Sequence, residues 1–337
     1  MSTPSSPLIS FVIPTWNRAQ YLERCLASII DQEPAVFEIV ISDNHSDDET
    51  ESVLNKFKNR PNIRCYVNTS NLGGEVNLHK VLSYASGTYV FVLTDDDYLL
   101  PRAVAALVAF LVKYSTCGVV LSPLLNEDDR VNRITGAAFA VERDTVYGAG
   151  EAALSNLFWE CHILSRLVVR RDLIDLEAFR CEFGRHLYTY IVVPALAMKQ
   201  APAGKLSTPL VVHTCNNKVS WTHTSDYSNS GLLEVIRTVV RGERYEQSVF
   251  DRLVKERVKY SFCQLYDARC RSSRTFFSVV IAHCRLPEYR RSVLFWSYAI
   301  VIGLLGATVV KVLGGGLKKI RCCWLAWRSA STCEFQG

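Results

Sequence analysis

Apolar and polar positions along the first hundred residues predict four strand–helix units. Short runs rich in β-branched and aromatic residues, typical of buried strands, lie at Leu8–Ile13, Phe37–Ser42, Ile63–Val67 and Tyr89–Leu93. After each of these runs, apolar residues recur every three or four positions, as in amphipathic helices. Strands that alternate with helices through short connections require a parallel sheet with right-handed crossovers. We therefore predict an α/β domain with a Rossmann-like, mostly parallel sheet flanked by helices.

Polar residues follow three of these strands where each one ends. The first strand leads into Pro14-Thr15-Trp16-Asn17-Arg18, the second into Asp43, and the fourth into Asp95-Asp96-Asp97. Because the carboxyl ends of parallel strands lie at one edge of the sheet, where ligands bind, we expect these residues to meet. Adjacent carboxylates are stabilised by a hard cation or by solvent. The pattern predicts a divalent cation that holds a diphosphate, and a solvated acidic turn is the alternative.

Three further features favour ligand binding at this edge of the sheet. Asp43 stands where a buried carboxylate can accept hydrogen bonds from a base or a ribose. The amides of the first helix and Arg18 would face an anion, whereas a helix cap and a surface charge are the alternative roles of Asn17 and Arg18. The loop 68–74 contains glycines that let a backbone approach a ligand or simply turn.

The order and spacing of these segments resemble the family 2 glycosyltransferases, which have the GT-A fold. The resemblance covers roughly residues 8–125. Its motifs are Ser10–Arg18 (opening strand and P-T-x-N-R turn), Asp43–Asp48 (D-[ND]-x-S-x-D), Asn71–Gly73 with Asn77 (N-x-G…N), and Thr94–Asp97 with Pro101 (D-x-D region). Within the family, the chain is similar to O-antigen transferases of the abequosyltransferase type.

The resemblance implies a nucleoside-diphosphate-sugar donor and a Mg or Mn ion that neutralises the departing diphosphate as a Lewis acid. The nucleotide-binding residues it implies are Pro14, Thr15, Asn17, Arg18, Asp43, Asn71, Gly73, Asp95 and Asp96. Two alignments of the family's D-x-D motif with this chain give different metal ligands. Aligned from Pro101, the ligands are Asp96 and Asp97, whereas a literal D-x-D match gives Asp95 and Asp97. Val76 stands where many relatives carry a basic residue, so their nucleotide preference does not transfer.

An inverting transfer needs a base that takes the proton of the acceptor hydroxyl. In the resembled family this base is an acid, often within an E-D pair, but residues 179–186 of this chain contain no such pair. Glu182 is the first candidate for the catalytic residue, His186 the second and Glu160 the third. A helix-cap or surface role is the alternative for Glu182 and for His186. Two histidines, His213 and His223, are candidates for completing the metal shell, and Trp221 for stacking on a sugar.

The second half is predicted to complete the sheet and to form the acceptor side. Its expected elements are strands at Gly118–Pro123, Ile163–Val169 and Leu210–His213, a charged surface loop at Asn126–Arg133, and a buried helix at Leu187–Met198 interrupted at Pro194. Helical spacing dominates from Tyr227 onward. We therefore predict a transferase domain at 1–225 and a helical C-terminal region at 226–337.

Charge divides the chain into two parts. Residues 1–240 hold 21 Lys and Arg against 26 Asp and Glu, a net −5, whereas residues 241–337 hold 17 against 7, a net +10. Residues 292–310 carry no charge and just meet the roughly twenty residues that a bilayer span needs. A single span, a helix in the interface and a buried helix are the three interpretations. We favour membrane association, since burial does not explain the surrounding positive charge.

Cysteine usage and the N-terminus bear on location. The 12 cysteines form no C-x-x-C pair, which favours thiols in a reducing compartment over a disulfide framework or a zinc site. Residues 1–7 lack the basic and apolar regions of a signal peptide. We expect the chain to work at the cytoplasmic face of a membrane, peripherally or through one C-terminal span.

The predicted activity is transfer of a sugar from a nucleotide donor to a hydroxyl of a saccharide or lipid-linked saccharide, with inversion, in cell-surface polysaccharide synthesis. The alternative is a non-catalytic nucleotide-sugar binding or scaffold protein that has lost the base. A nucleotidyltransferase is disfavoured because no glycine-rich, Lys-containing loop follows the first strand. Nucleic-acid binding is disfavoured because the basic excess accompanies an apolar segment.

Overall fold

The computed structural model describes residues 6–34, 36–184, 188–215, 235–237, 239 and 246–304. The chain divides into two compact units. Unit 1 holds residues 1–185 and 189–221, and unit 2 holds residues 186–188 and 222–337. The boundary predicted at 225/226 falls within residues 216–234, which lie outside the described part of the chain.

Unit 1 is built on a sheet with the strand order β3-β2-β1-β4-β10-β6-β11-β9. Its strands are β1 (Ile9–Thr15), β2 (Phe37–Asp43), β3 (Ile63–Val67), β4 (Tyr89–Val92), β6 (Val119–Leu121), β9 (Thr145–Tyr147), β10 (Leu167–Arg170) and β11 (Ala203–Lys205). The first four strands are all parallel. Strand β10 runs antiparallel between β4 and β6. The predicted mostly parallel α/β sheet is confirmed.

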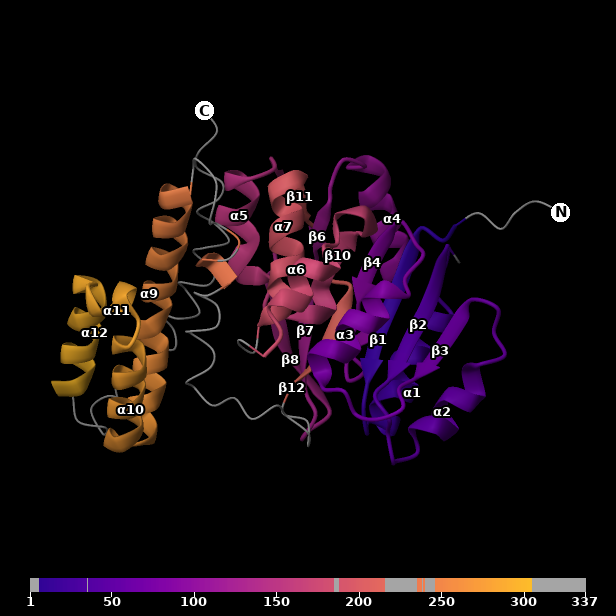
Figure 1. Cartoon of the computed structure of the whole chain (residues 1–337), viewed down its shortest axis with the longest axis horizontal. Coiled ribbons are helices and arrows are strands. Elements are labelled where there is room, and N and C mark those ends of the chain that lie inside the picture. Colours follow the sequence, from indigo (N-terminus) through magenta and orange to yellow (C-terminus); the bar gives the residue numbers. More distant parts are fainter. Residues whose placement is uncertain are drawn as a thin grey trace. The chain divides into compact units, whose positions relative to one another are not determined.

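Helices cover both faces of this sheet (Figure 1). They are α1 (Ala19–Ile30), α2 (Thr50–Phe57), α3 (Gly74–Ser83), α4 (Ala103–Lys113), α5 (Glu151–Leu157), α6 (Leu176–Cys181) and α7 (Val192–Gln200). Side chains of α1, α2 and α4 share a core with alternate residues of β1, β2 and β4. Phe11, which is fully buried, sits within this core with ring centroids 5.6 Å from Phe37 and 5.2 Å from Phe91. This core fixes the strands whose ends carry the predicted ligands.

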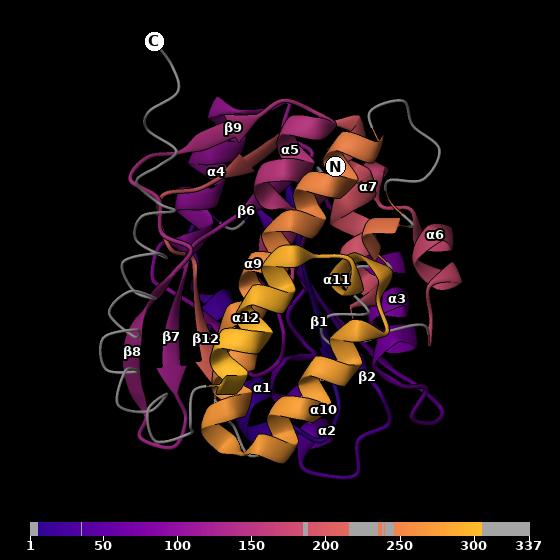
Figure 2. The same ribbon diagram turned by 90° about the vertical axis from the view of Figure 1, so that its left-hand side faces the viewer.

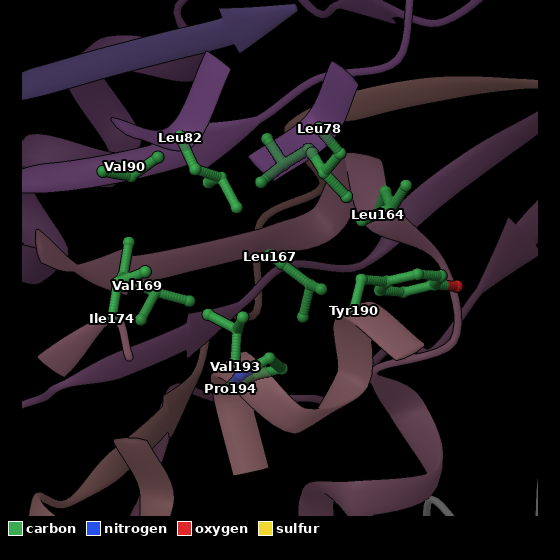
Figure 3. A pocket seen from close by; sticks show the side chains of 11 residues that line it. Leu78, Leu82, Val90, Leu164, Leu167, Val169, Ile174, Tyr190, Val193 and Pro194 are labelled. Carbon is green, nitrogen blue, oxygen red and sulfur yellow. The ribbon is translucent and has the colours of Figure 1, made fainter. Parts of the chain in front are cut away.

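The opposite face carries α3 and α7 over β4 and β10, with a small apolar cavity between them (Figure 3). Its volume is about 20 Å³, and its lining includes Leu78, Val90, Leu167 and Val193. A space of this size holds about one water, and a water there would need polar partners. The hydroxyl of Tyr190, the one polar side chain in the lining, already donates to the His162 carbonyl at 2.7 Å. The cavity is therefore a packing gap.

A second sheet lies beside the acidic turn. It has the order β5-β12-β7-β8, with β5 (Tyr98–Leu99), β12 (Val211–Cys215), β7 (Leu124–Asp128) and β8 (Arg133–Ala138). Strand β12 pairs antiparallel with β5, which follows Asp97 directly, and parallel with β7. The charged loop predicted at Asn126–Arg133 is confirmed only for residues 129–132, because residues 126–128 end β7 and Arg133 begins β8.

Two further local predictions are corrected. Helix α7 is not interrupted at Pro194, because it begins at Val192 and Pro194 stands in its first turn. A proline is tolerated there, since the N–H that it lacks has no partner within the helix. The strand predicted at Ile163–Val169 begins only at Leu167, after a 3₁₀ turn at Leu164–Arg166.

Unit 2 is helical in its described residues, with α9 (Glu246–Arg271), α10 (Ser273–Cys284), α11 (Pro287–Arg290) and α12 (Val293–Leu304). Both α10 and α12 pack on α9 (Figure 2). The ring of buried His283 stacks on Phe295 at 5.5 Å and meets Tyr289 edge-on at 4.7 Å. Among the described helices, none combines the length and the hydropathy that crossing a membrane requires. Helix α12 covers part of the predicted segment 292–310, and residues 305–310 lie outside the described part.

Candidate active site

The loops that follow β1 and β2 are joined by hydrogen bonds. Asn17 and Asp47 make a reciprocal pair, in which Asn17 Nδ2 donates to the Asp47 carboxylate at 2.6 Å and the Asp47 amide donates to Asn17 Oδ1 at 2.9 Å. The Asn17 amide donates to Ser46 Oγ at 2.8 Å. Asn17 has φ of 52°, a left-handed conformation that asparagine adopts more readily than most residues. Asn17 therefore fixes the two loops against each other.

Asp43 ends β2 opposite Thr15, which ends β1. Asp43 is only 3% exposed, and burial raises the pKa of its carboxyl while the Ser46 hydrogen bonds oppose the rise. Ser46 Oγ donates to Asp43 Oδ1 at 2.6 Å. Thr15 and Pro14 are on the neighbouring strand, and the Thr15 carbonyl accepts from the Asn44 amide at 2.9 Å. The structure thus brings Pro14, Thr15 and Asp43 together at the predicted edge.

Asn44 joins the third loop to this edge. Its Nδ2 donates to Asn71 Oδ1 at 2.8 Å, and its Oδ1 accepts from the Leu72 amide at 2.9 Å. Asn71 Oδ1 also accepts from the Gly73 amide at 2.9 Å, and Gly73 has φ of 84°, which favours glycine. Sequence reasoning noted Asn44 without assigning it a role. Its position directly after the strand-ending Asp43 was the signal that could have found it.

The first two carboxylates of the acidic turn face Arg18. Arg18 Nη1 lies 2.5 Å from Asp96 Oδ2 and 3.5 Å from Asp95 Oδ1, and the Arg18 side chain is only 9% exposed. Burial and the neighbouring Asp96 raise the pKa of Asp95 to about 7, although Arg18 acts in the opposite direction. The Arg18 guanidinium therefore compensates part of the negative charge of this turn. The interpretation as a turn stabilised by solvent alone does not include this ion pair.

Asp97 points to different partners. Its buried carboxylate accepts from the Thr214 amide at 2.8 Å and from Thr94 Oγ1 at 3.0 Å, and it contacts His213 Nδ1 at 3.0 Å. His213 lies on β12 and its side chain is 29% exposed. Burial lowers the pKa of His213, but the hydrogen bonds and charges of Asp97 and Cys215 together outweigh burial and raise the pKa to about 11. The two predicted metal ligands, Asp96 and Asp97, thus separate into an arginine pair and a histidine pair.

The Asp97–His213 pair fits a divalent cation. Carboxylate oxygen and imidazole nitrogen are ligands that Mg and Mn accept. Asp97 Oδ2 and His213 Nδ1 lie 3.0 Å apart, so both side chains could bind one ion. Within the part of the chain that the structure describes, no three His, Cys, Asp or Glu side chains group closely enough to hold a metal. Such an ion commonly takes its other ligands from phosphate and water.

Arg24, which sequence reasoning missed, supports this turn from α1. Its Nη2 donates to Thr214 Oγ1 at 2.9 Å and to the Asp96 carbonyl at 3.3 Å. Its Nη1 pairs with Glu127 Oε2 at 2.8 Å, and its guanidinium lies 4.4 Å from the Tyr98 ring centroid. Because these partners come from the acidic turn and from the second sheet, Arg24 connects the turn to the strand that carries His213.

Trp16 is a second residue to which sequence reasoning gave no role. It stands between Thr15 and Asn17 and is 46% exposed. Tryptophan is highly buried on average in folded proteins. Trp16 therefore presents an apolar surface at the edge that Thr15 and Asp43 share.

The candidates for the catalytic base differ in their surroundings. Glu160 pairs with Arg166 at 3.0 Å and with Lys205 at 2.7 Å, so both its oxygens are engaged. Glu182 is 3% exposed and directly follows α6. His186 lies outside the described residues, as do Trp221 and His223.

The stretch that follows Glu182 is tied to the start of α3. The Gly184 amide and Thr189 Oγ1 donate to the Glu75 carboxylate at 2.8 Å and 2.7 Å. Glu75 lies two residues after Gly73 in the loop joined to Asn44. This stretch is thereby fastened to the same edge of unit 1.

A 3-2-1-4 parallel sheet with an acidic turn at its carboxyl edge is the arrangement of the GT-A class of α/β folds. The structure of Staphylococcus aureus TarS 1–349 in complex with UDP matches with a TM-score of 0.57 and 18% identity, covering 91% of each chain. A mannosyltransferase from Pyrobaculum calidifontis in complex with GDP-Man and Mn²⁺ matches with a TM-score of 0.52 and 15% identity, covering 97% of this chain and 85% of that one. These likenesses show the fold.

Sequence comparison identifies one part of the chain. Residues 10–164 match the family described as glycosyl transferase family 2, so the chain carries a domain of that family. Abequosyltransferase RfbV of Salmonella typhimurium is 41% identical over 108 residues, 31% of this chain and 32% of that protein. The GalNAc(5)-diNAcBac-PP-undecaprenol beta-1,3-glucosyltransferase of Campylobacter jejuni is 38% identical over 103 residues, 30% of this chain and 33% of that protein. The matched part spans about a third of each curated relative.

Proposed function

We propose that this chain transfers a sugar from a nucleoside-diphosphate sugar to a hydroxyl of a saccharide or lipid-linked saccharide. The observation that carries the proposal is the meeting of Asp43, the loop of Asn71 and the acidic turn at one sheet edge. Hydrogen bonds of Asn17 and Asn44 join the first three loops, and the Arg18–Asp96 ion pair joins the acidic turn to the loop after β1. Such an edge is where open α/β sheets bind nucleotides. The family 2 domain at residues 10–164 supports the same assignment.

The nucleoside is assigned to the loops of β1 and β2. Asp43 has a buried carboxylate that can accept from a base, with Pro14 and Thr15 on the adjacent strand. The half-exposed ring of Trp16 offers a surface for stacking. Asn17, Asn71 and Gly73 complete this part by shaping the loops, and Gly73 leaves the backbone open to a close approach.

The ribose and diphosphate are assigned to the acidic turn. Asp95 and Asp96 accept from ribose hydroxyls while Arg18 compensates their charge. Asp97 and His213 would hold Mg or Mn, whose charge stabilises the departing diphosphate. The structural neighbour from Pyrobaculum calidifontis, which is a complex with GDP-Man and Mn²⁺, supports a metal here. An imidazole binds a metal only when neutral, so His213 would have to be neutral at Nδ1 to hold the ion beside Asp97.

The relatives and the charge of the chain support a proposal for the acceptor and the location. The Campylobacter jejuni relative is named for an undecaprenol-linked saccharide. A lipid-linked acceptor and work at the cytoplasmic face of a membrane fit the net +10 of residues 241–337. We assign inversion, with Glu182 or His186 as the base, in cell-surface polysaccharide synthesis.

A non-catalytic nucleotide-sugar binding protein is the second candidate. The observation that favours it is that Glu160 is held between two cations and Glu182 is almost fully buried. A buried carboxylate reaches an acceptor hydroxyl only if its surroundings move. Binding without turnover is the behaviour that this candidate predicts.

Screening separates the two candidates. The full chain is incubated with UDP-, GDP-, dTDP- and CDP-sugars, Mn²⁺ and a membrane extract as acceptor, and release of nucleoside diphosphate is measured. An enzyme releases diphosphate from one donor, and Asp97→Asn and His213→Gln reduce the release. Glu177→Gln is the control, because Glu177 forms an exposed pair with Arg180 on α6. Saturable nucleotide binding without release from any donor assigns the scaffold function, and absence of binding contradicts both candidates.

A further inference from the structure

Helix α10 of unit 2 has apolar residues on two opposite faces. Phe276, Val279 and His283 are buried. The other face places Phe277 and Ile281 in solvent, each 59% exposed. Arg274 and Arg285, both exposed, continue the same stripe at three or four residue intervals on either side. An apolar pair between two arginines therefore runs along the outer face of this helix.

Helix α12 shows the same division without any charged residue. Its inner face buries Phe295, Ala299 and Ile302. Its outer face exposes Val293 at 84%, Trp296 at 38%, Ile300 at 57%, Val301 at 55% and Leu304 at 83%. Apart from exposed Ser297, both faces are apolar, which is typical of a helix buried in a protein or in a membrane. In the described residues the inner face alone is covered, because α12 packs on α9.

Both stripes belong to helices that pack on the same element, α9, and Figure 2 draws α10, α11 and α12 in front of it. We name their exposed arginines and large apolar side chains the outer face: Arg274, Phe277, Ile281, Arg285, Arg290, Arg291, Val293, Trp296, Ile300, Val301 and Leu304. This set of apolar side chains is larger than the scattered exposed hydrophobics of ordinary surfaces. It calls for a covering partner.

The arginines of the outer face favour an anionic partner. Residues 272–304 contain four arginines and one acidic residue, Glu288, which pairs with Arg237 at 2.5 Å. Arg290 and Arg291 are exposed between the two stripes. Two copies of the outer face would bring like charges together, which disfavours a self-complementary contact. An anionic surface with an apolar interior satisfies both features, since arginines meet lipid phosphates while the apolar side chains enter the acyl boundary.

We propose that the outer face docks unit 2 on the surface of an anionic lipid bilayer. Helices α10 and α12 would lie in the interface, with Trp296 at headgroup depth, where tryptophan is enriched. The inference rests on the proposed function in one respect, because docking would bring the chain to a lipid-linked acceptor. Its physical basis in exposure and charge is independent of turnover.

Vesicle sedimentation tests the proposal. The full chain is mixed with vesicles of neutral phosphatidylcholine or with vesicles that also contain phosphatidylglycerol, and the bound fraction is measured against lipid concentration. We expect binding to the anionic vesicles that weakens as salt is added. Phe277→Ser combined with Ile300→Ser should weaken it roughly tenfold or more, because two large apolar side chains no longer leave water. Arg290→Gln with Arg291→Gln should weaken it roughly tenfold or more, at about fivefold for each charge.

Val112→Ser is the matched control, since Val112 is a comparably exposed apolar residue, 74% exposed, on α4 of unit 1. Circular dichroism verifies that each variant keeps its helices. Equal binding to neutral and anionic vesicles, no binding, or an equal loss in Val112→Ser overturns the proposal. A dimer in light scattering that Phe277→Ser with Ile300→Ser dissociates assigns the face to a second copy instead. Release of nucleoside diphosphate without vesicles is measured in parallel, so that a failed docking surface and a failed transferase are told apart.

Discussion

Replacing Glu160 by Gln removes the charge that compensates a buried arginine in unit 1. Arg166 is fully buried, with its guanidinium 3.0 Å from Glu160 Oε2, 2.8 Å from the Ser122 carbonyl and 3.8 Å from the Phe139 ring centroid. Lys205, 9% exposed, shares the same carboxylate at 2.7 Å. Burial lowers the pKa of Arg166, and Glu160 opposes that effect. Without this carboxylate, two nearly buried cations face each other uncompensated.

The cost follows from the burial. Breaking a buried ion pair from one side costs about 3–5 kcal/mol. Glutamine keeps an oxygen that can accept from Arg166, so we expect the lower end, about 3 kcal/mol. For a domain of the size of unit 1, each kcal/mol lowers the melting temperature by about 2–4 °C, so Glu160→Gln should lower it by roughly 6–12 °C.

Thermal unfolding followed by circular dichroism, together with urea unfolding, measures this change. Glu177→Gln is the control, because it breaks the same kind of Glu–Arg pair on the surface of α6 and should leave the melting temperature unchanged. An unchanged melting temperature for Glu160→Gln, combined with loss of diphosphate release, would refute the reasoning. That result would identify Glu160 as the base and would leave the Arg166 charge compensated by other groups.

Three further predictions concern other parts of unit 1. Arg24→Gln should weaken Mn²⁺-dependent nucleotide binding roughly ten- to hundredfold in calorimetry, because Arg24 holds the Asp96 carbonyl and the strand of His213, and Arg24→Lys should restore part of it. Gly73→Ala should cost about 1–2 kcal/mol in urea unfolding, since φ is 84° and no neighbouring atom lies within 4 Å to add a clash. The pKa of Glu38 is lowered by its hydrogen bonds although burial raises it, so its contribution is present above the unfolded pKa and is lost as the pH falls below about 4.5. Glu38→Gln should therefore flatten the fall in stability on the acid side of a urea-unfolding series measured against pH.

The sequence predicts the strands in which all consecutive residues are buried. Strands β1, β2 and β4 are buried on both faces, so each reads as a continuous apolar run and its end is marked by a polar turn. The hairpin β7–β8 was missed because it lies at a sheet edge, where β8 is almost wholly exposed and carries no apolar alternation. Its strands are recognisable only from the pairing of β7 with β12.

Some residues of the candidate site can likewise be predicted from local sequence, and others cannot. Strand ends predict that Thr15, Asp43 and the acidic turn share an edge, and the structure brings them together. The partners of Asp97 and Arg24 on β12 lie more than a hundred residues away, and no local pattern encodes them. Their assignment depends on how β12 docks beside β5, which is a tertiary property.

Nucleotide binding tests the central claim most directly. The full chain is titrated with UDP, GDP, dTDP and CDP in the presence of Mn²⁺ by isothermal calorimetry, beside Asp43→Asn and Glu177→Gln. We predict saturable one-to-one binding of one nucleotide by the wild type and by Glu177→Gln, and binding at least roughly tenfold weaker for Asp43→Asn, because a buried carboxylate that accepts from the nucleoside is lost. Binding of none of the four nucleotides, or equal binding by Asp43→Asn, would contradict the account.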